Sequence, residues 1–174
     1  TGVAVPARPS PTVAGFSVVH ESDYYAEAVA WAKDSGITSG TTSTTFSPGN
    51  TVTRAQAVTF LWRAAGSPQP SSLVSPFTDV TDPDSYYYQA VLWAAEQGIT
   101  TGVTAAAFGA DSAVAYDQML AFLARAAGAE TGGGSWSDAA IRWAADNGLT
   151  DGLTFSAKAA CPRSDVVYCL WKQL

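Results

Sequence analysis

Two stretches of the chain carry apolar residues at the spacing of a helix face. Over residues 53–65, Leu61 and Trp62 follow Val58 at intervals of three and four. Thr53 is a favourable N-cap residue with a glutamine three residues later, and a glycine follows the last residue. This pattern predicts a helix over residues 53–65.

An earlier stretch, residues 23–35, has the same character. It opens on Ser22 or Asp23 as the cap and closes at Gly36. Its apolar positions at helical spacing are Tyr25, Ala28, Val29 and Ala32. We therefore expect a second helix here.

The loop between these two helices has about 15 residues, which is long for a compact domain. We expect it to be functional or to be packed by its own side chains, with Phe46 as the internal contact. At its two ends, Ile37 and Val52 are expected to pair as a very short strand.

This helix–loop–helix pattern occurs three times. Residues 24–66 align with residues 86–128 without gaps, and residues 136–174 form a third copy with three residues fewer in its loop. Trp31, Trp93 and Trp143 share one position in the three copies, and Arg54, Tyr116 and Arg163 share another. Each copy is preceded by a lead-in, which reads FSV at Phe16, FTD at Phe77 and WSD at Trp136.

The repeats divide the chain. Residues 1–15 are rich in proline and are expected to be an extended leader, and residues 16–174 are expected to form a single module. The repeats span residues 16–66, 77–128 and 136–174, with linkers rich in Pro, Gly and Ser between them. One helix pair of this size cannot bury its apolar face, so the sequence predicts a mainly α fold with a shared helical core.

Composition and charge argue against some classes of function. Of the 174 residues 47% are hydrophobic and 14% are charged, which is typical of a globular chain. The net charge of −6 argues against nucleic-acid binding, and no apolar run reaches the roughly 20 residues of a membrane span. Because the first residue is Thr1, we expect a processed or excised piece.

The chain offers little material for catalysis or metal binding. His20 is the only histidine, so neither a Ser-His-Asp triad nor a zinc site with the two cysteines is expected. We expect no enzyme activity, no cofactor and no metal. Cys161 and Cys169 are either joined by a disulfide or are buried thiols.

Arg54 stands out because it falls in the first turn of its predicted helix. A cation is unfavourable there by about 0.3–1 kcal/mol, since the helix dipole is positive at that end. A bound carboxylate would reverse this, because free backbone N–H groups and the planar guanidinium would converge on it. The alternatives are an ordinary exposed arginine and one paired with a neighbouring Asp or Glu.

The motifs of the first repeat resemble the S-layer homology (SLH) domain family. The resemblance rests on the sequence GITSG at residues 36–40, TFSP at 45–48 and VTRAQ at 52–56, and it extends over residues 16–174. It implies three tandem repeats packed with pseudo-threefold symmetry around a central helical bundle. It also implies a secreted module that anchors a larger exported protein to the bacterial cell wall.

The same resemblance implies the ligand and its site. SLH modules bind secondary cell-wall polysaccharide, often pyruvylated, in grooves between neighbouring repeats, with the motif arginine as the main anion contact. That role falls on Arg54 and Arg163. The full set of candidate ligand-binding residues is Arg54, Arg163, Thr53, Gln56, Gly40, Gly102 and Trp31. Trp31 and its equivalents either pack in the core or stack on sugars, and the glycines either shape turns or let a sugar approach the backbone.

The other two repeats depart from the motif. In repeat 2, Tyr116 replaces the arginine and Asp117 adds negative charge, so no anion site is expected there. In repeat 3, Arg163 is kept, whereas Pro162 replaces the cap residue, and Asp165 caps locally or pairs with Arg163. We therefore expect at most two anion sites, with Arg54 the better one. The alternative function is an SLH-fold scaffold or protein-interaction module that has lost glycan binding.

Overall fold

The computed structural model describes residues 12–13, 16–20, 23–38, 49–100, 104, 106–129, 135–151 and 153–173. Within these ranges the chain forms six helices and one two-stranded sheet, so the predicted mainly α fold is confirmed. None of the helices among these residues is long and apolar enough to cross a membrane.

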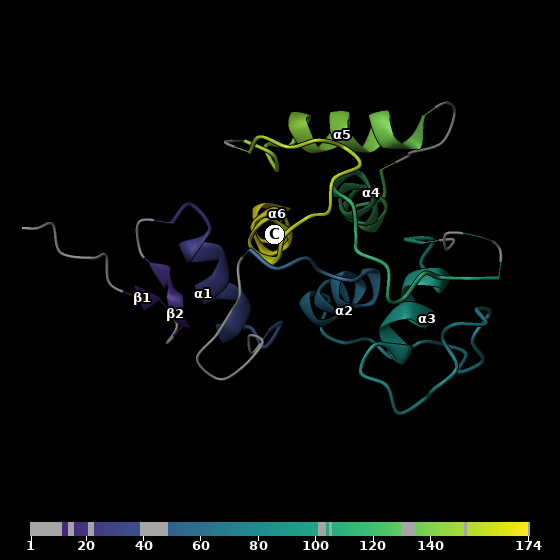
Figure 1. The fold of residues 1–174 in the computed structure, drawn as a ribbon. Helices are drawn as coiled ribbons and strands as arrows, with labels where there is room; N and C mark the ends of the chain where they lie inside the picture. The colour runs from purple at the N-terminus through teal and green to yellow at the C-terminus, as the bar shows by residue number, and fades with distance from the viewer. Residues whose placement is uncertain are drawn as a thin grey trace, which may run out of the picture.

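Each repeat contributes one inner and one outer helix. The inner helices are α2 (Arg54–Ala64), α4 (Tyr116–Ala126) and α6 (Arg163–Gln173), which contact one another at the centre of the module (Figure 1). The outer helices are α1 (Ala26–Asp34), α3 (Tyr88–Glu96) and α5 (Trp136–Asp146).

The outer helices do not pack on the inner helix of their own repeat. Instead α3 packs on α2, α5 packs on α4, and α1 packs on α6, as Figure 1 shows. Each repeat therefore covers its neighbour, and the contact between α1 and α6 closes the ring. The predicted shared helical core is present, but its pairs are formed between repeats.

The segments that lead into the inner helices also pair between repeats. Isolated β-bridges join Thr51 to Pro162, Thr53 to Ala113, and Ala115 to Ala160. In addition, the Val114 N–H donates to the Val52 carbonyl at 2.7 Å. The predicted pairing of Ile37 with Val52 is wrong, because the strand-like contacts of this segment go to the other two repeats.

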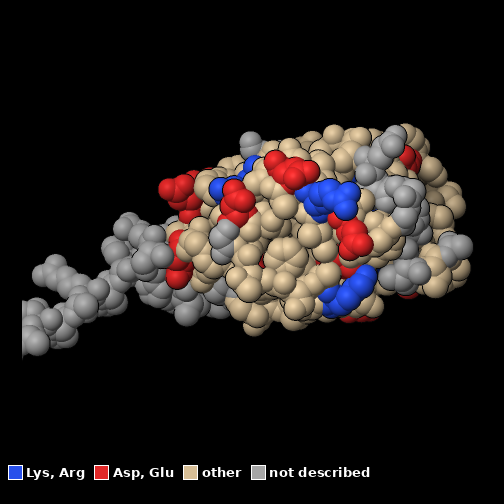
Figure 2. Space-filling view, turned by 90° about the horizontal axis from the view of Figure 1, so that it is seen from above, with Lys and Arg blue, Asp and Glu red and all other residues tan. Residues whose placement is uncertain are grey.

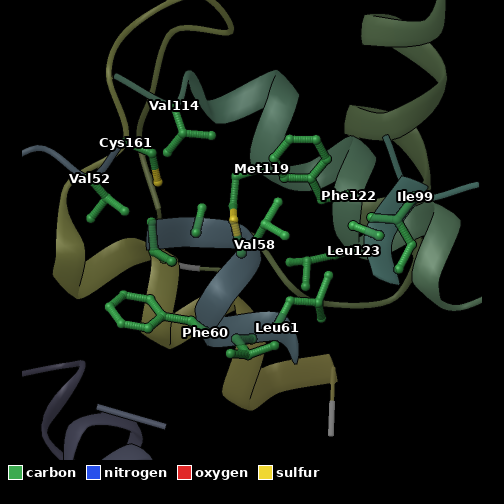
Figure 3. Close-up of a cluster of buried hydrophobic side chains, with 14 of the residues drawn as sticks. Val52, Val58, Phe60, Leu61, Ile99, Val114, Met119, Phe122, Leu123 and Cys161 are labelled. Atoms are coloured by element: carbon green, nitrogen blue, oxygen red, sulfur yellow. The ribbon is translucent and has the colours of Figure 1, made fainter. Parts of the chain in front are cut away.

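The core consists of apolar side chains from all three inner helices and their lead-in segments. Figure 3 shows Val58 and Leu61 of α2 meeting Met119 and Leu123 of α4, with Cys161 nearby from the segment before α6. Cys161 and Cys169 are both free and 1% exposed, so of the two expectations the structure has buried thiols. Trp31, Trp93 and Trp143 are half-buried against this core, as expected for a recurring packing position.

Helix ends follow the sequence closely. Thr53 caps α2 by accepting a hydrogen bond from the Gln56 N–H, and the Gln56 side chain accepts one from the Thr53 N–H at 3.0 Å. Gly36 and Gly66 follow α1 and α2 with φ of 73° and 92°, the left-handed conformation that suits glycine at a helix end. Phe46 and the rest of its loop lie outside the described residues.

Two predicted helix starts differ from the structure. Helix α1 begins at Ala26 rather than Asp23, because the Asp23 carbonyl accepts the Ala26 N–H and closes a turn first. In repeat 3 the predicted lead-in beginning at Trp136 is itself the first turn of α5, capped by Ser135. The lead-in of repeat 2 precedes α3 instead, and there Phe77 is buried against Phe108.

A small antiparallel sheet precedes the first helix. Strand β1 (Thr12–Val13) pairs with β2 (Phe16–His20), with Thr12 opposite His20. Both strands contact α1 (Figure 1). The end of the predicted leader is thus paired backbone, while residues 1–11 lie outside the described part of the chain.

Candidate ligand-binding grooves

A pocket of about 240 Å³ lies where three repeats meet. Its floor is one face of α2, and its walls come from the end of repeat 1's outer helix, from the start of α6 and from the residues before α3. The lining residues are Thr38, Gln56, Thr59, Phe60, Arg63, Tyr86 and Arg163. Two of them carry guanidinium groups and none carries a carboxylate, so this pocket is positive although the chain as a whole is acidic.

Arg163 reaches this pocket from the first turn of α6. Its Nη2 donates to the Thr38 hydroxyl at 3.1 Å, and its guanidinium carbon lies 5.3 Å from the centre of the Phe60 ring. The side chain is 5% exposed, and burial lowers the pKa of Arg163 while the neighbouring Tyr86 opposes that shift. The guanidinium is thus held in a fixed orientation at the pocket wall.

Arg63 is the second cation of the pocket. Its Nη1 donates to the Ile37 carbonyl at 3.0 Å, which fixes the side chain across the end of α1. Arg125 makes the corresponding bond in repeat 2, to the Ile99 carbonyl at 3.2 Å. Sequence reasoning missed Arg63, although its recurrence as Arg125 in the aligned second repeat was a usable signal.

Arg54 has the same surroundings as Arg163, one repeat further along the chain. Its Nη2 lies 3.4 Å from the Thr100 hydroxyl, and its guanidinium carbon lies 5.1 Å from the centre of the Phe122 ring. In addition, its Nε donates to the Phe108 carbonyl at 2.9 Å. Thr100 and Phe122 align with Thr38 and Phe60, so the two arginines occupy equivalent grooves.

Arg54 is buried and has charged neighbours of both signs. It is 4% exposed, and burial followed by the positive charge of Arg125 lowers its pKa to about 10, with Asp79 opposing the shift. The group is still protonated at neutral pH. Arg54 is therefore neither an exposed surface arginine nor one in a simple ion pair.

The backbone N–H groups of the first helical turn are not available, contrary to expectation. The N–H groups of Arg54 and Ala55 donate to the carbonyls of Ser112 and Ala110 at 2.8 and 3.2 Å. The Arg163 N–H donates to the Asn50 carbonyl at 2.9 Å. The expected convergence of free N–H groups on a carboxylate is wrong, because these groups bond to the loop of the neighbouring repeat.

Asp79 holds one of these loops in place. Its carboxylate accepts hydrogen bonds from the N–H groups of Phe108, Gly109 and Ala110 at 2.8, 2.8 and 3.0 Å. Burial works against the charged form, yet these backbone donors together lower the pKa of Asp79. Sequence reasoning noted the FTD lead-in but gave Asp79 no role.

The third groove has a different character. Tyr116, which stands at the position of the arginines, stacks on Phe155 with ring centres 4.8 Å apart and donates its hydroxyl to the Asp165 carboxylate. Tyr24 donates to the other oxygen of the same carboxylate. Asp165 therefore pairs with two tyrosine hydroxyls rather than with Arg163, and this groove presents aromatic rings and an acid where the other two present a cation.

One exposed aromatic side chain recurs at the start of each outer helix. Tyr24 and Tyr86 are 53% and 52% exposed, and Trp136 at the aligned position is 38% exposed. Tyr86 lines the pocket of Arg163, Tyr24 borders the groove of Asp165, and the Trp136 ring lies 4.8 Å from the Lys158 ammonium. Tyr86 and Tyr24 are placed to offer a flat apolar surface beside the grooves of Arg163 and Asp165.

The other candidate ligand-binding residues lie in different parts of the structure. Gln56 lines the pocket of Arg163 and also completes the cap of α2 with Thr53. Trp31 is half-buried against the core. Gly40 and Gly102 lie outside the described residues. On the face in Figure 2, basic and acidic side chains lie close to one another, so this face carries no extended basic patch.

Comparison with known proteins agrees with this architecture. Residues 19–58 and 76–120 match the family model of the S-layer homology domain. The chain is also 38% identical over 90 residues to an endoglucanase of Bacillus sp. (strain KSM-635), and the match covers 52% of this chain but 9% of that protein. The chain spans only a small part of that relative.

The S-layer homology domain is a cell-surface anchoring module without catalytic function. The matched segments hold the outer helices α1 and α3 and the first residues of the inner helices α2 and α4. The two outer helices pack on α6 and α2, the inner helices that carry Arg163 and Arg54. This chain belongs to the S-layer homology domain family, and its repeats form a module for association with the cell surface.

Proposed function

We propose that this chain is a non-catalytic module that binds an acidic secondary cell-wall polysaccharide, with pyruvate as the acidic group, in the grooves between its repeats. The observation that carries the proposal is the pocket of about 240 Å³, lined by Arg163 and Arg63 and by no carboxylate. A carboxylate ligand would gain from two guanidinium groups that are already oriented.

The sugar part of such a ligand has a surface beside the cations. Tyr86 is 52% exposed and lines the same pocket as Gln56 and Thr59. A flat aromatic face together with amide and hydroxyl groups is a common arrangement for binding a ring with hydroxyl substituents. The pocket thus offers partners to both parts of a pyruvylated sugar.

The arginine pattern gives a proposed stoichiometry. Arg163 and Arg54 stand in equivalent grooves, whereas the third groove carries Tyr116 and the Asp165 carboxylate. We expect the third groove to reject a carboxylate. Of the two others, the groove of Arg163 is now the stronger candidate, because Arg54 bonds to the Phe108 carbonyl and lies between two rings.

The proposed setting follows from the family. The module would hold a larger exported parent protein at the bacterial surface, outside the cell, with the wall polysaccharide as its partner. The endoglucanase relative, of which the match covers 9%, is one example of a much longer protein that contains such a segment.

A second function, a scaffold without glycan binding, is supported by one observation. The Arg54 Nε donates to the Phe108 carbonyl, and Tyr116 stacks on Phe155, so both side chains take part in packing between repeats. Under this alternative the grooves stabilise the module and a protein is the partner.

Calorimetric titration with purified wall polysaccharide, with its pyruvate intact and chemically removed, tests the proposal. We expect Arg163→Gln to weaken binding about tenfold or more, since it loses a charge-assisted contact of roughly 1.5–3 kcal/mol. Arg142→Gln on the exposed side of α5 is the matched control and should bind as the wild type does.

Two results would count against the anion site. Equal binding of the polymer without pyruvate would keep the anchor and remove the role given to Arg163. Absence of binding to a wall preparation from the source organism, with the variants folded by circular dichroism, would favour the scaffold.

A further inference from the structure

The loop of repeat 2 that precedes α4 is held from two sides, by Asp79 and by the start of α2. Asp79 accepts hydrogen bonds from the N–H groups of Phe108 and Ala110 at 2.8 and 3.0 Å. The Phe108 carbonyl in turn accepts a hydrogen bond from the Arg54 Nε at 2.9 Å. The Ala110 carbonyl accepts one from the Ala55 N–H at 3.2 Å. Each of these two loop residues therefore joins the Asp79 carboxylate to the first turn of α2.

These bonds fix the direction in which the Arg54 guanidinium points. Its Nε bonds to the Phe108 carbonyl and its Nη2 lies 3.4 Å from the Thr100 hydroxyl, whereas its Nη1 makes no hydrogen bond with the residues that the structure describes. The rings of Phe108 and Phe122 lie 4.9 and 5.1 Å from the guanidinium carbon and confine it. A guanidinium held at its Nε presents the edge formed by Nη1 and Nη2, which suits a carboxylate.

Asp79 also offsets the positive charge around Arg54. Burial and then the charge of Arg125 lower the pKa of Arg54, and Asp79 opposes that shift. Burial raises the pKa of Asp79, but the hydrogen bonds from the loop N–H groups together lower it below its ordinary value, so this carboxylate is charged at neutral pH. Asp79 thus favours both the orientation and the charged form of Arg54.

The lead-in segments of the other two repeats differ at this point. Repeat 1 has Val18 at the third position of its lead-in, and in repeat 3 the corresponding Asp138 lies in the first turn of α5. The arrangement is therefore specific to the groove of Arg54. We propose that Asp79 is a positioning residue, which orients the Arg54 guanidinium in its groove by holding residues 108–112 against α2.

The positioning itself does not rest on the proposed function. Only its use, which is to present Arg54 to the carboxylate of a wall polymer, rests on that function. The orientation of Arg54 is therefore measured first without a ligand, and binding is measured afterwards.

The first measurement is the hydrogen-exchange rate of the Arg54 Nε–H in the ¹⁵N-labelled full chain, followed by NMR and assigned from the spectrum of Arg54→Lys. In Asp79→Asn, an NH₂ group that cannot accept an N–H replaces one of the two carboxylate oxygens. We expect the Arg54 Nε–H to exchange about tenfold faster in Asp79→Asn than in the wild type, because the loop is held less firmly. Asp79 is exposed, so the variant should fold.

Two controls separate positioning from a general loss of stability. The Trp62 Nε1–H, which donates to the Pro68 carbonyl at 2.7 Å near the other end of α2, should keep its exchange rate in Asp79→Asn. Asp138→Asn, the same change in the lead-in of repeat 3, should leave the Arg54 signal as it is in the wild type. An unchanged rate for the Arg54 Nε–H in Asp79→Asn, or an equal acceleration at Trp62, overturns the proposal.

Binding of pyruvylated wall polysaccharide is then measured by calorimetry in an Arg163→Gln background, where Arg54 is the remaining arginine at the motif position. Adding Asp79→Asn should weaken binding about tenfold, and adding Asp138→Asn should not. Faster exchange at Arg54 in a protein that binds no polymer even with Asp79 intact would refute the proposed function while supporting the positioning role. Unchanged binding in Asp79→Asn, despite faster exchange at Arg54, would overturn the use of this positioning in binding.

Discussion

Asp165 is a buried carboxylate held by two hydroxyl groups. It is 5% exposed, and its two oxygens accept hydrogen bonds from Tyr24 and Tyr116, which come from the other two repeats. Burial, then the hydrogen bond to Asp165 and the charge of that carboxylate, raise the pKa of both tyrosines. One side chain of repeat 3 thus links all three repeats.

Tyr116→Phe should destabilise the module by about 1–3 kcal/mol at pH 7, because a buried carboxylate oxygen loses its donor. The effect should depend on pH. A hydroxyl whose pKa is raised by folding stabilises fully below its unfolded pKa of about 10 and loses that contribution as pH rises above it. The difference between wild type and variant should therefore shrink from pH 10 upward, as measured by urea unfolding at several pH values.

Tyr87→Phe is the control for that series, since its ring packs against Tyr86 at 5.1 Å and it does not contact Asp165. A difference between wild type and Tyr116→Phe that grew above pH 10 would contradict the sign of the pKa shift.

At the scale of helices, local signals in the sequence predicted the helices and several of their ends, although the starts of α1 and α5 differ from the prediction. The start of α2 was predicted by the capping pair Thr53 and Gln56, and the ends of α1 and α2 were predicted by the glycines that follow them. These features involve residues only a few positions apart. The partners of each helix were not predictable in this way. Packing of α1 on α6, burial of Arg54 and the bonded N–H groups of its turn all depend on residues of another repeat.

The N-caps of the inner helices α2 and α4 differ in whether they carry a hydroxyl group. Thr53 supplies a hydroxyl to the Gln56 N–H, whereas Ala115 at the aligned position has none, although the Gln118 side chain still accepts the Ala115 N–H at 3.0 Å. Thr53→Ala should lower stability by about 0.5–2 kcal/mol, and Ala115→Thr should raise it by a smaller amount. Urea unfolding of the two variants measures both, and destabilisation by Ala115→Thr would show that the bridge to Ala160 cannot accept the larger side chain.

At the scale of the whole molecule, the packing between repeats makes the module one unit. Within an isolated first repeat, α1 would lack α6 and α2 would lack α3. Residues 16–66 alone should therefore show little helical signal in circular dichroism and no cooperative melting, whereas the full chain should melt in one transition. A cooperative melt of the isolated repeat would mean that its two helices can pack on each other.

The contact between α1 and α6 also determines when the helices can pack during folding. Helix α1 ends at Asp34 and its partner α6 begins at Arg163, so 128 of the 174 residues lie between them. During synthesis, which proceeds from the N-terminus, α1 can pack on β1 and β2 but has no inner helix to pack on until α6 has emerged. Closing so long a loop is slow compared with local helix formation. Helix α1 therefore waits longest for its inner-helix partner, and the ring of repeats can close only after α6 has been synthesised.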